Sequence, residues 1–235
     1  MAERFGAGPE AGPEVVAGGQ VHAGSGWPAA RTGASLLAVT GALFLLYPVL
    51  RPYSDESTLA GARAMSGPGW LVSHLLAVAG FVLLALSLLA LYRLLQGGPG
   101  ERQALRAVAA TWTGAGLTLP YYGAEVFGLH AISLRALREQ DPALLELAET
   151  MRMGPVPAAM FAAGLALLAG GTVLAALAVG RSAALPRGSG AVLAVAFVLF
   201  LPQFFTAPPV RMAHGALVAL GCGRLAVALW RSARR

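Results

Sequence analysis

The sequence predicts an all-α, polytopic integral membrane protein with six transmembrane helices in one bundle. Hydrophobic residues make up 57% of the chain and charged residues only 12%, whereas a soluble domain carries about 25% charged residues. The apolar residues fall in runs of about 20, without the regular alternation of polar and apolar residues that is typical of a β-strand. Because the bilayer core offers no water to backbone groups, we expect these runs to fold as helices.

The segment of residues 1–32 is rich in Gly, Ala and Pro and has few large apolar side chains. Such a segment buries too little surface to offset its ordering entropy, so we predict a disordered cytoplasmic tail followed by a membrane domain over residues 33–235. The tail is too long and too acidic for the n-region of a secretory signal, and we expect the first span to stay uncleaved. The predicted spans cover residues 33–50, 70–92, 107–131, 155–179, 190–207 and 210–230.

Proline residues interrupt three of these spans and separate the last two. Pro48, Pro120 and Pro202 lie in the first, third and fifth spans, beside aromatic residues. A proline inside a helix removes a hydrogen bond and favours a kink, so the three kinks could open a vestibule. Pro208 and Pro209 allow only a tight turn before the last span, and if only one of the two flanking segments crosses the membrane, the count falls to five.

The loop after the third span predicts a short amphipathic surface helix. Asp141 suits an N-cap and Pro142 suits the first helical position. Apolar residues then recur at helical spacing, at Leu144, Leu147, Ala148 and Met151. The polar side of this helix would hold Glu146, Glu149 and Arg152, and we expect it to lie along the outer membrane surface.

The distribution of basic residues predicts how the chain is oriented in the membrane. All 17 are arginine, and they are in excess in the two tails and in the loops after the second and fourth spans. The opposite loops balance arginine with acidic residues, so the positive-inside rule predicts that both termini are cytoplasmic. The absence of lysine suggests a GC-rich bacterial genome and hence a bacterial inner membrane. A net charge of +6, spread over short loops, predicts membrane lipids rather than nucleic acid as partners.

The candidate functional residues are polar groups that lie at similar depth near the outer ends of the spans. Glu125 is the only carboxylate within a predicted span, and a charge in hydrocarbon is costly enough to indicate a functional site. Arg211 and His214 share one helical face, and Tyr121 and Tyr122 share the side of Glu125, where a phenol could bond to the carboxylate. The candidate set is His74, Tyr121, Tyr122, Glu125, Arg211 and His214.

Three interpretations of this polar layer remain open. In the first, Glu125 pairs with Arg211 in a structural network that orders the helices. In the second, the layer binds or transports a lipid headgroup, a small solute or a proton. In the third, His74, Glu125 and His214 hold zinc or haem in an intramembrane, hydrolase-like enzyme, because two histidines and a carboxylate are a known zinc ligand set. We expect a structural or binding role without a cofactor, with the metal-dependent enzyme as the alternative.

Two resemblances accompany these residues. Ser73 and His74, with a Glu in the third span and a His in the sixth, resemble the intramembrane hydrolases related to alkaline ceramidases and progestin receptors. That superfamily has seven helices and a paired late histidine motif that this chain lacks, so its chemistry is not carried over. The stretches YYGAEVFGLH and FLPQFF resemble small, uncharacterised integral membrane proteins of high-GC bacteria. This second resemblance implies the membrane class and no activity.

Overall fold

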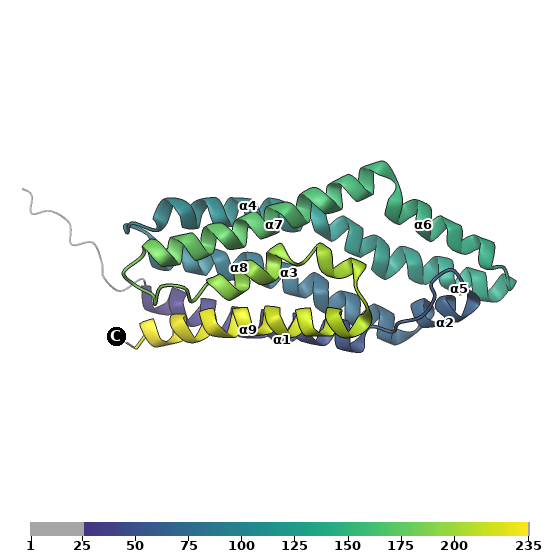
Figure 1. Ribbon diagram of the computed structural model, residues 1–235, viewed down its shortest axis with the longest axis horizontal. Coiled ribbons are helices and arrows are strands. Elements are labelled where there is room, and N and C mark those ends of the chain that lie inside the picture. The colour runs from purple at the N-terminus through teal and green to yellow at the C-terminus, as the bar shows by residue number, and fades with distance from the viewer. Residues whose placement is uncertain (1–25, 235) are drawn as a thin grey trace, which may run out of the picture.

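The computed structural model describes residues 26–234, and all the regular secondary structure in that range is helical (Figure 1). The longer helices are α1 (Gly26–Leu50), α3 (Pro68–Leu95), α4 (Glu101–Gly123), α7 (Pro155–Arg181) and α9 (Pro208–Ser232). The shorter helices are α2 (Leu59–Ser66), α5 (Leu129–Glu139), α6 (Glu146–Met153) and α8 (Ala191–Val198). A π-helical turn, η1 (Ala124–Gly128), joins α4 to α5, and two 3-10 turns are η2 (Pro142–Leu145) and η3 (Pro202–Phe205).

Four helices of the described part, α1, α3, α7 and α9, are long and apolar enough to cross a membrane. They coincide with four of the six predicted spans. The third predicted span is α4 with η1, whose residues are less apolar, and the helix continues into α5 well beyond the predicted end at residue 131. The fifth is divided, because α8 ends at Val198 and the chain then turns at Pro202 into η3. Whether these two segments cross a membrane stays a prediction.

The long segments pack in a ring in which α1 contacts α3 and α9, α4 contacts α3 and α7, and α8 contacts α7 and α9. The interior holds an aromatic core in which Phe44 makes edge contacts with Phe81, Phe197 and Phe200. Two helix pairs approach closely at glycine. A Cβ atom on Gly171 of α7 would lie 3.0 Å from the backbone nitrogen of Thr111 in α4, and one on Gly41 of α1 would lie 3.2 Å from Ala219 in α9.

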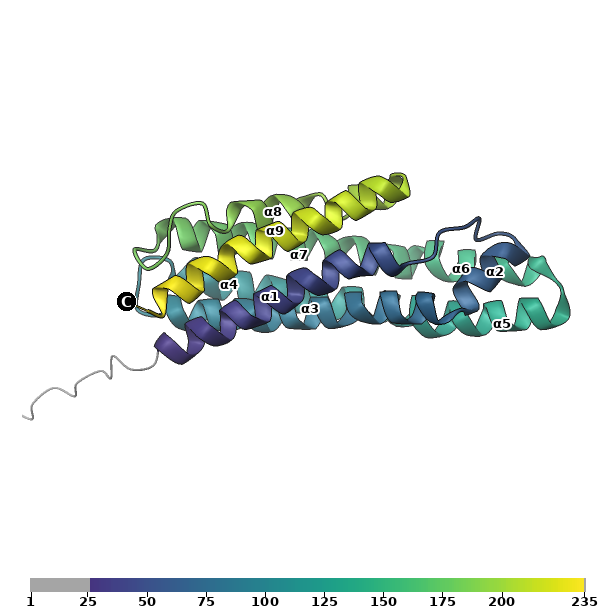
Figure 2. The same ribbon diagram turned by 90° about the horizontal axis from the view of Figure 1, so that it is seen from below.

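A second, smaller apolar cluster lies beyond the ends of α1 and α9, where α2, α5, η2 and α6 form a cap (Figure 2). The predicted loop helix is confirmed: Asp141 is its N-cap and accepts a hydrogen bond from the Ala143 backbone, and η2 leads into α6. Its apolar side packs within this cap rather than lying apart from the fold, since Leu145 and Ala148 are buried in the cluster. We call this end of the molecule the cap end.

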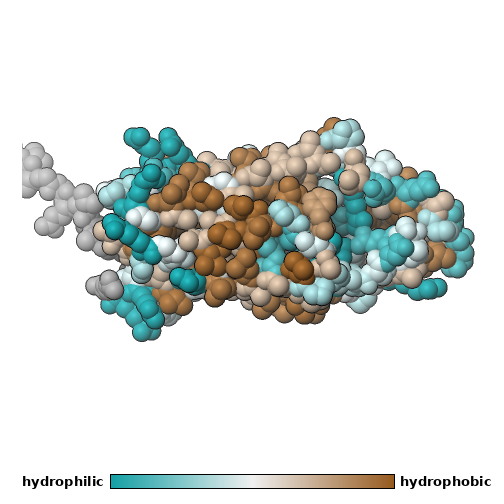
Figure 3. All heavy atoms as spheres, viewed as in Figure 1, coloured by the Kyte–Doolittle hydropathy of each residue, from teal (hydrophilic) through white to brown (hydrophobic). Residues whose placement is uncertain are grey.

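The opposite end, which we call the terminal end, holds the start of α1 and the end of α9 (Figure 1). On the face that Figure 3 shows, apolar side chains predominate in the middle of the molecule, and hydrophilic ones gather at both ends. The predicted disordered tail lies mostly outside the described residues. Its boundary was wrong, because α1 begins at Gly26 and residues 26–32 are therefore helical.

Candidate functional site

The candidate site lies at the junction of the ring and the cap, where α4 passes from an α-helix into the π-helical turn η1. Pro120 has no backbone N–H to donate, and a π-helical turn follows from Ala124 to Gly128. The indole Nε1 of Trp70, a fully buried residue of α3, donates a 2.7 Å hydrogen bond to the Glu125 backbone carbonyl in this turn. Single π-helical turns occur frequently at functional sites, and this one brings Glu125 to the cap.

The side chain of Glu125 is bound by Arg152 of α6. The guanidinium Nε lies 2.6 Å from Oε1 of Glu125, and Nη2 lies 2.9 Å from Oε2, so the pair is bidentate. Nη1 of Arg152 donates to Oε2 of Glu56 at 2.5 Å, and Nη2 of Arg51 donates to Oε1 of the same carboxylate at 2.6 Å. We call Arg51, Glu56, Glu125 and Arg152 the Arg152 network.

The network joins segments that are far apart in the sequence. Arg51 and Glu56 come from the loop between α1 and α2, Glu125 from η1 and Arg152 from α6. The guanidinium carbons of Arg51 and Arg152 lie 4.8 Å and 5.9 Å from the ring centre of Trp70, so both cations also face an aromatic ring. The formal charges of the network cancel, and the network fastens the cap to the ring.

The two arginines control the charge of Glu56. Burial alone raises the pKa of Glu56, but the nearby cations of Arg152 and Arg51 and their hydrogen bonds lower that pKa by more, and it lies below its usual value. Burial lowers the pKa of Arg152, and the carboxylates of Glu125 and Glu56 raise it by more. Both groups therefore stay ionised at neutral pH, which keeps the link between α6 and the loop after α1 intact.

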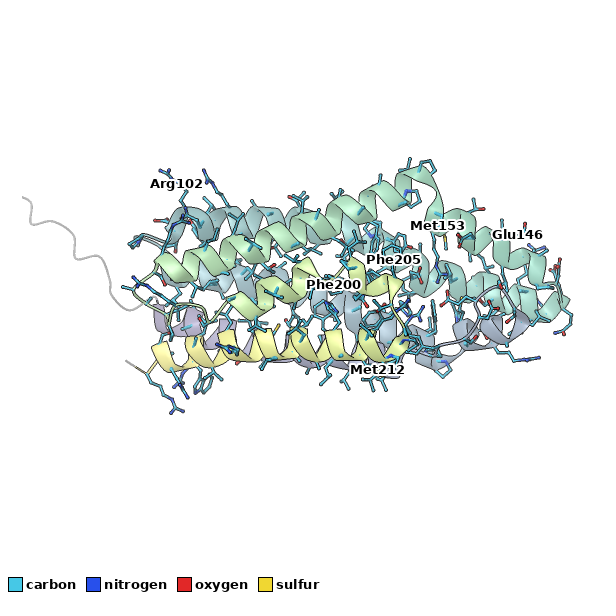
Figure 4. All side chains as sticks on the ribbon, in the orientation of Figure 1. Arg102, Glu146, Met153, Phe200, Phe205 and Met212 are labelled. Atoms are coloured by element: carbon cyan, nitrogen blue, oxygen red, sulfur yellow. The ribbon has the colours of Figure 1, made fainter. Side chains whose placement is uncertain are left out.

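A cavity of about 260 Å³ adjoins the Arg152 network between α4 and α7. It lies beneath the bend at Gly154, where α6 ends and α7 begins with Pro155. Figure 4 shows Glu146 and Met153 at the two ends of α6, with Met153 next to this bend. The cavity is lined mainly by apolar side chains, including Leu117, Leu129, Met151 and Met160, with Tyr121, Glu125 and Arg152 as its polar residues.

Three of the predicted site residues lie at or near the network. His74 Nε2 lies 3.8 Å from Oε2 of Glu125, which is too far for a hydrogen bond, and its Nδ1 lies 2.8 Å from the Trp70 carbonyl. Tyr121 lines the cavity and stacks on Phe161 with ring centres 4.1 Å apart. Tyr122 points into the aromatic core, and its buried hydroxyl has no well-formed hydrogen bond with the described residues. The bond from a phenol to Glu125 that the sequence suggested is not formed among the described residues, where both carboxylate oxygens accept from Arg152 instead.

The predicted pairing of Glu125 with Arg211 was also wrong. Arg211 instead donates from Nε to the Thr206 carbonyl at 3.0 Å and from Nη2 to the Phe204 carbonyl at 2.5 Å, both at the end of η3. His214 Nε2 lies 2.8 Å from the Ala196 carbonyl of α8. Arg211 and His214 do share a face of α9, as predicted, but they use it to hold the irregular α8–η3 segment.

The predicted metal site is not assembled in the described part of the chain. His74 and Glu125 are neighbours, but His214 bonds to the backbone of α8, and no group of three His, Cys, Asp or Glu residues within residues 26–234 is placed to hold a metal ion. Each network glutamate is also engaged by an arginine. The geometry therefore gives the hydrolase alternative no support.

Three of the four network residues, Arg51, Glu56 and Arg152, were not predicted as site residues from the sequence. Arg152 was assigned to the polar side of its helix, yet it follows the buried residues Leu145 and Ala148 at the spacing that repeats one helical face. That phase was the signal that could have placed it inward. Arg51 and Glu56 lie in a loop, where no periodicity predicts the direction of a side chain.

The comparisons with known proteins leave the family open. No protein family, curated protein or solved structure matches this chain. The predicted resemblance to small membrane proteins of high-GC bacteria therefore stays a prediction, and the case for function depends on the cavity and on the Arg152 network.

Proposed function

We propose that the protein is an integral membrane protein of a bacterial inner membrane that binds the apolar part of a membrane lipid, or of a similar amphipathic molecule, at the cap end. The observation that carries the proposal is the cavity of about 260 Å³ beneath the bend between α6 and α7. An apolar cavity of about 150 Å³ can hold benzene, so this one has room for a ring or for a short length of hydrocarbon chain. Membrane lipids are the most abundant source of such chains.

The polar residues of the cavity restrict the chemistry of the polar part of the ligand. The hydroxyl of Tyr121 makes no hydrogen bond with the described residues, and Arg152 has N–H groups beyond the three that bind Glu56 and Glu125. Both groups donate hydrogen bonds. We infer that the ligand offers an acceptor oxygen next to its apolar part, such as an ester carbonyl, a quinone carbonyl or a phosphate.

Six membrane crossings with both termini in the cytoplasm are part of this proposal. Helix α3 ends at the terminal end and α7 starts at the cap end, so α4 has to run the length of the molecule between them (Figure 1). The same reasoning applies to the α8–η3 segment between α7 and α9. This alternation supports six crossings, and the arginine excess at the terminal end supports its cytoplasmic location.

The test is native mass spectrometry of the whole protein, extracted gently from its membrane. We expect the wild-type protein to retain one lipid in this cavity. Leu117→Trp places a large side chain in the cavity and should remove that lipid. The control is Leu105→Trp, which adds the same side chain to α4 at a position that is 51% exposed and outside the cavity.

The comparison of these two variants decides the proposal. Loss of the lipid in Leu117→Trp, with retention in Leu105→Trp and an unchanged melting temperature, supports a site in the cavity. A wild-type protein without bound lipid, or equal retention by both variants, contradicts it.

A further inference from the structure

A second groove lies at the terminal end of the molecule, between α1 and α3. Its volume is about 490 Å³, and it is lined on its apolar part by Leu36, Leu86 and Leu89. Its polar part consists of Thr32, Arg93 and Gln96. The groove is formed by other helices than the cavity beneath the α6–α7 bend, and it belongs to the opposite end of the molecule.

The apolar and polar parts of the groove follow one another along the helix axes. Leu86, Leu89 and Arg93 recur on one face of α3, whose chain runs toward the terminal end, and Gln96 is the C-cap of this helix. Helix α1 runs the opposite way, and a Cβ atom on Gly33 would lie 3.1 Å from Cβ of Ala90. Thr32 is therefore level with the turn that carries Arg93, while Leu36 faces the leucines deeper in the apolar region.

The charge at this end is complementary to an anion. Arg93 is exposed, and no described residue forms an ion pair with it. Within the described residues, the terminal end carries one acidic residue, Glu101. Its arginines are Arg31, Arg93, Arg102, Arg106, Arg181, Arg187, Arg231 and Arg234. An unpaired guanidinium at the polar end of an apolar groove fits a phosphate that is attached to hydrocarbon.

We propose that this groove binds one anionic phospholipid, with its phosphate at Arg93 and one acyl chain along Leu36, Leu86 and Leu89. Thr32 and Gln96 lie beside Arg93 and offer further hydrogen-bond donors to the headgroup. Basic pockets between membrane helices bind anionic headgroups in this manner. The site is independent of the ligand cavity at the cap end, and either site can exist without the other.

The experiment is a lipid titration of the delipidated full-length protein, followed by native mass spectrometry. Phosphatidylglycerol and phosphatidylcholine with identical chains are compared. We expect one phosphatidylglycerol to bind more tightly than phosphatidylcholine. Arg93→Gln should weaken the binding of phosphatidylglycerol about fivefold, and Leu89→Trp, which fills the apolar part of the groove, should weaken the binding of both lipids.

Two matched controls make the result specific. Arg102→Gln removes the same charge from the start of α4 at the same end (Figure 4), and Val82→Trp adds the same ring to an exposed position of α3 outside the groove. Both variants should bind phosphatidylglycerol as the wild type does. The proposal is overturned if Arg93→Gln and Arg102→Gln weaken binding equally, if the two lipids bind alike, or if the spectrum shows a second copy of the chain in place of the lipid.

Discussion

At the scale of single residues, Arg152 is the residue on which the candidate site depends. Its guanidinium binds two carboxylates from two other segments and faces Trp70. Its side chain is 17% exposed and that of Glu125 is 9% exposed. Removing one member of a buried ion pair leaves the other charge without a partner, and this costs more than the pair itself contributes.

A double-mutant cycle tests this pairing. We expect Arg152→Gln and Glu125→Gln each to lower the free energy of unfolding by about 2–3 kcal/mol, with a coupling energy of about 1–3 kcal/mol. Arg211→Gln is the control, because Arg211 binds backbone carbonyls and should act additively with Glu125→Gln. Unfolding in mixed micelles measures six proteins: the wild type, the three single variants, and the double variants that combine Glu125→Gln with each arginine variant. A coupling to Arg211 as large as that to Arg152 would refute the pairing.

Acid should weaken the same network through Glu56. The pKa of Glu56 in the folded protein lies below its ordinary value of 4.5. Its contribution to stability is therefore complete above about pH 4.5 and is lost as the pH falls through the lower, folded pKa. We expect the unfolding temperature of the wild type to drop over this acidic range and that of Glu56→Gln to drop less.

The control for the acid-unfolding experiment is Glu146→Gln, which removes an exposed carboxylate at the start of α6. It should leave the pH dependence of the unfolding temperature as it is in the wild type. If Glu56→Gln and Glu146→Gln gave the same pH profile, the link between Glu56 and the two arginines would carry no stability.

The sequence predicted Glu125 as a site residue because a carboxylate in an apolar span is conspicuous. It could not predict the partner, since Arg152 lies on a separate helix, beyond the span, and reaches Glu125 only after α6 folds back against α5 and α7. His74 and Tyr121 were predicted near Glu125 from depth and helical phase, and both are close to it. Arg211 and His214 have a similar depth, but they face a different part of the ring.

At the scale of secondary structure, the long apolar helices can be predicted from their composition. The irregular segments depend on packing against distant parts of the chain, so composition does not predict them. Hydropathy predicted α1, α3, α7 and α9. In the π-helical turn, the Glu125 carbonyl accepts a hydrogen bond from Trp70, a residue far away in the sequence. Helix α2 was missed because it is short, although Thr58 is an N-cap that accepts a hydrogen bond from the Gly61 backbone.

The contact between α4 and α7 can be tested at two neighbouring glycines. A Cβ atom on Gly171 would lie 3.0 Å and 3.2 Å from the backbone of Thr111 and Ala107, whereas one on Gly170 would meet nothing within 4 Å. We expect Gly171→Ala to destabilise the protein by about 1–3 kcal/mol through overpacking, and Gly170→Ala to have no such effect. Thermal unfolding of both variants measures the difference, and equal melting temperatures would show that this close approach does not limit stability.

At the scale of the whole molecule, the alternating direction of the helices predicts which loops face the same side of the membrane. Accessibility of single cysteines, introduced into a Cys222→Ala background, measures this in intact cells. We expect Ser57→Cys, Ala143→Cys and Ala207→Cys to react with an impermeant reagent. Arg102→Cys and Arg187→Cys should react only after permeabilisation. Labelling of Arg102→Cys and Ala143→Cys from one side would mean that α4 does not cross the membrane.

The ring and the cap together enclose an apolar cavity next to a balanced set of charges, and lipid binding there is what the arrangement predicts for the molecule as a whole. Fastening of α6 by the Arg152 network keeps the bend at Gly154 over the cavity. Loss of the network should therefore affect both stability and ligand retention, whereas filling of the cavity should affect ligand retention alone.

Photo-crosslinking in the native membrane measures the occupant of the cavity most directly. Cells are supplied with a lipid that carries a diazirine in its acyl chain, and the labelled peptides are mapped by mass spectrometry. We expect the label to concentrate on the segments of α4 and α7 that contain Leu117 and Met160, and to be lost from them in Leu117→Trp but not in Leu105→Trp. Even labelling of all exposed apolar surfaces, unchanged by Leu117→Trp, would contradict a ligand site in this cavity.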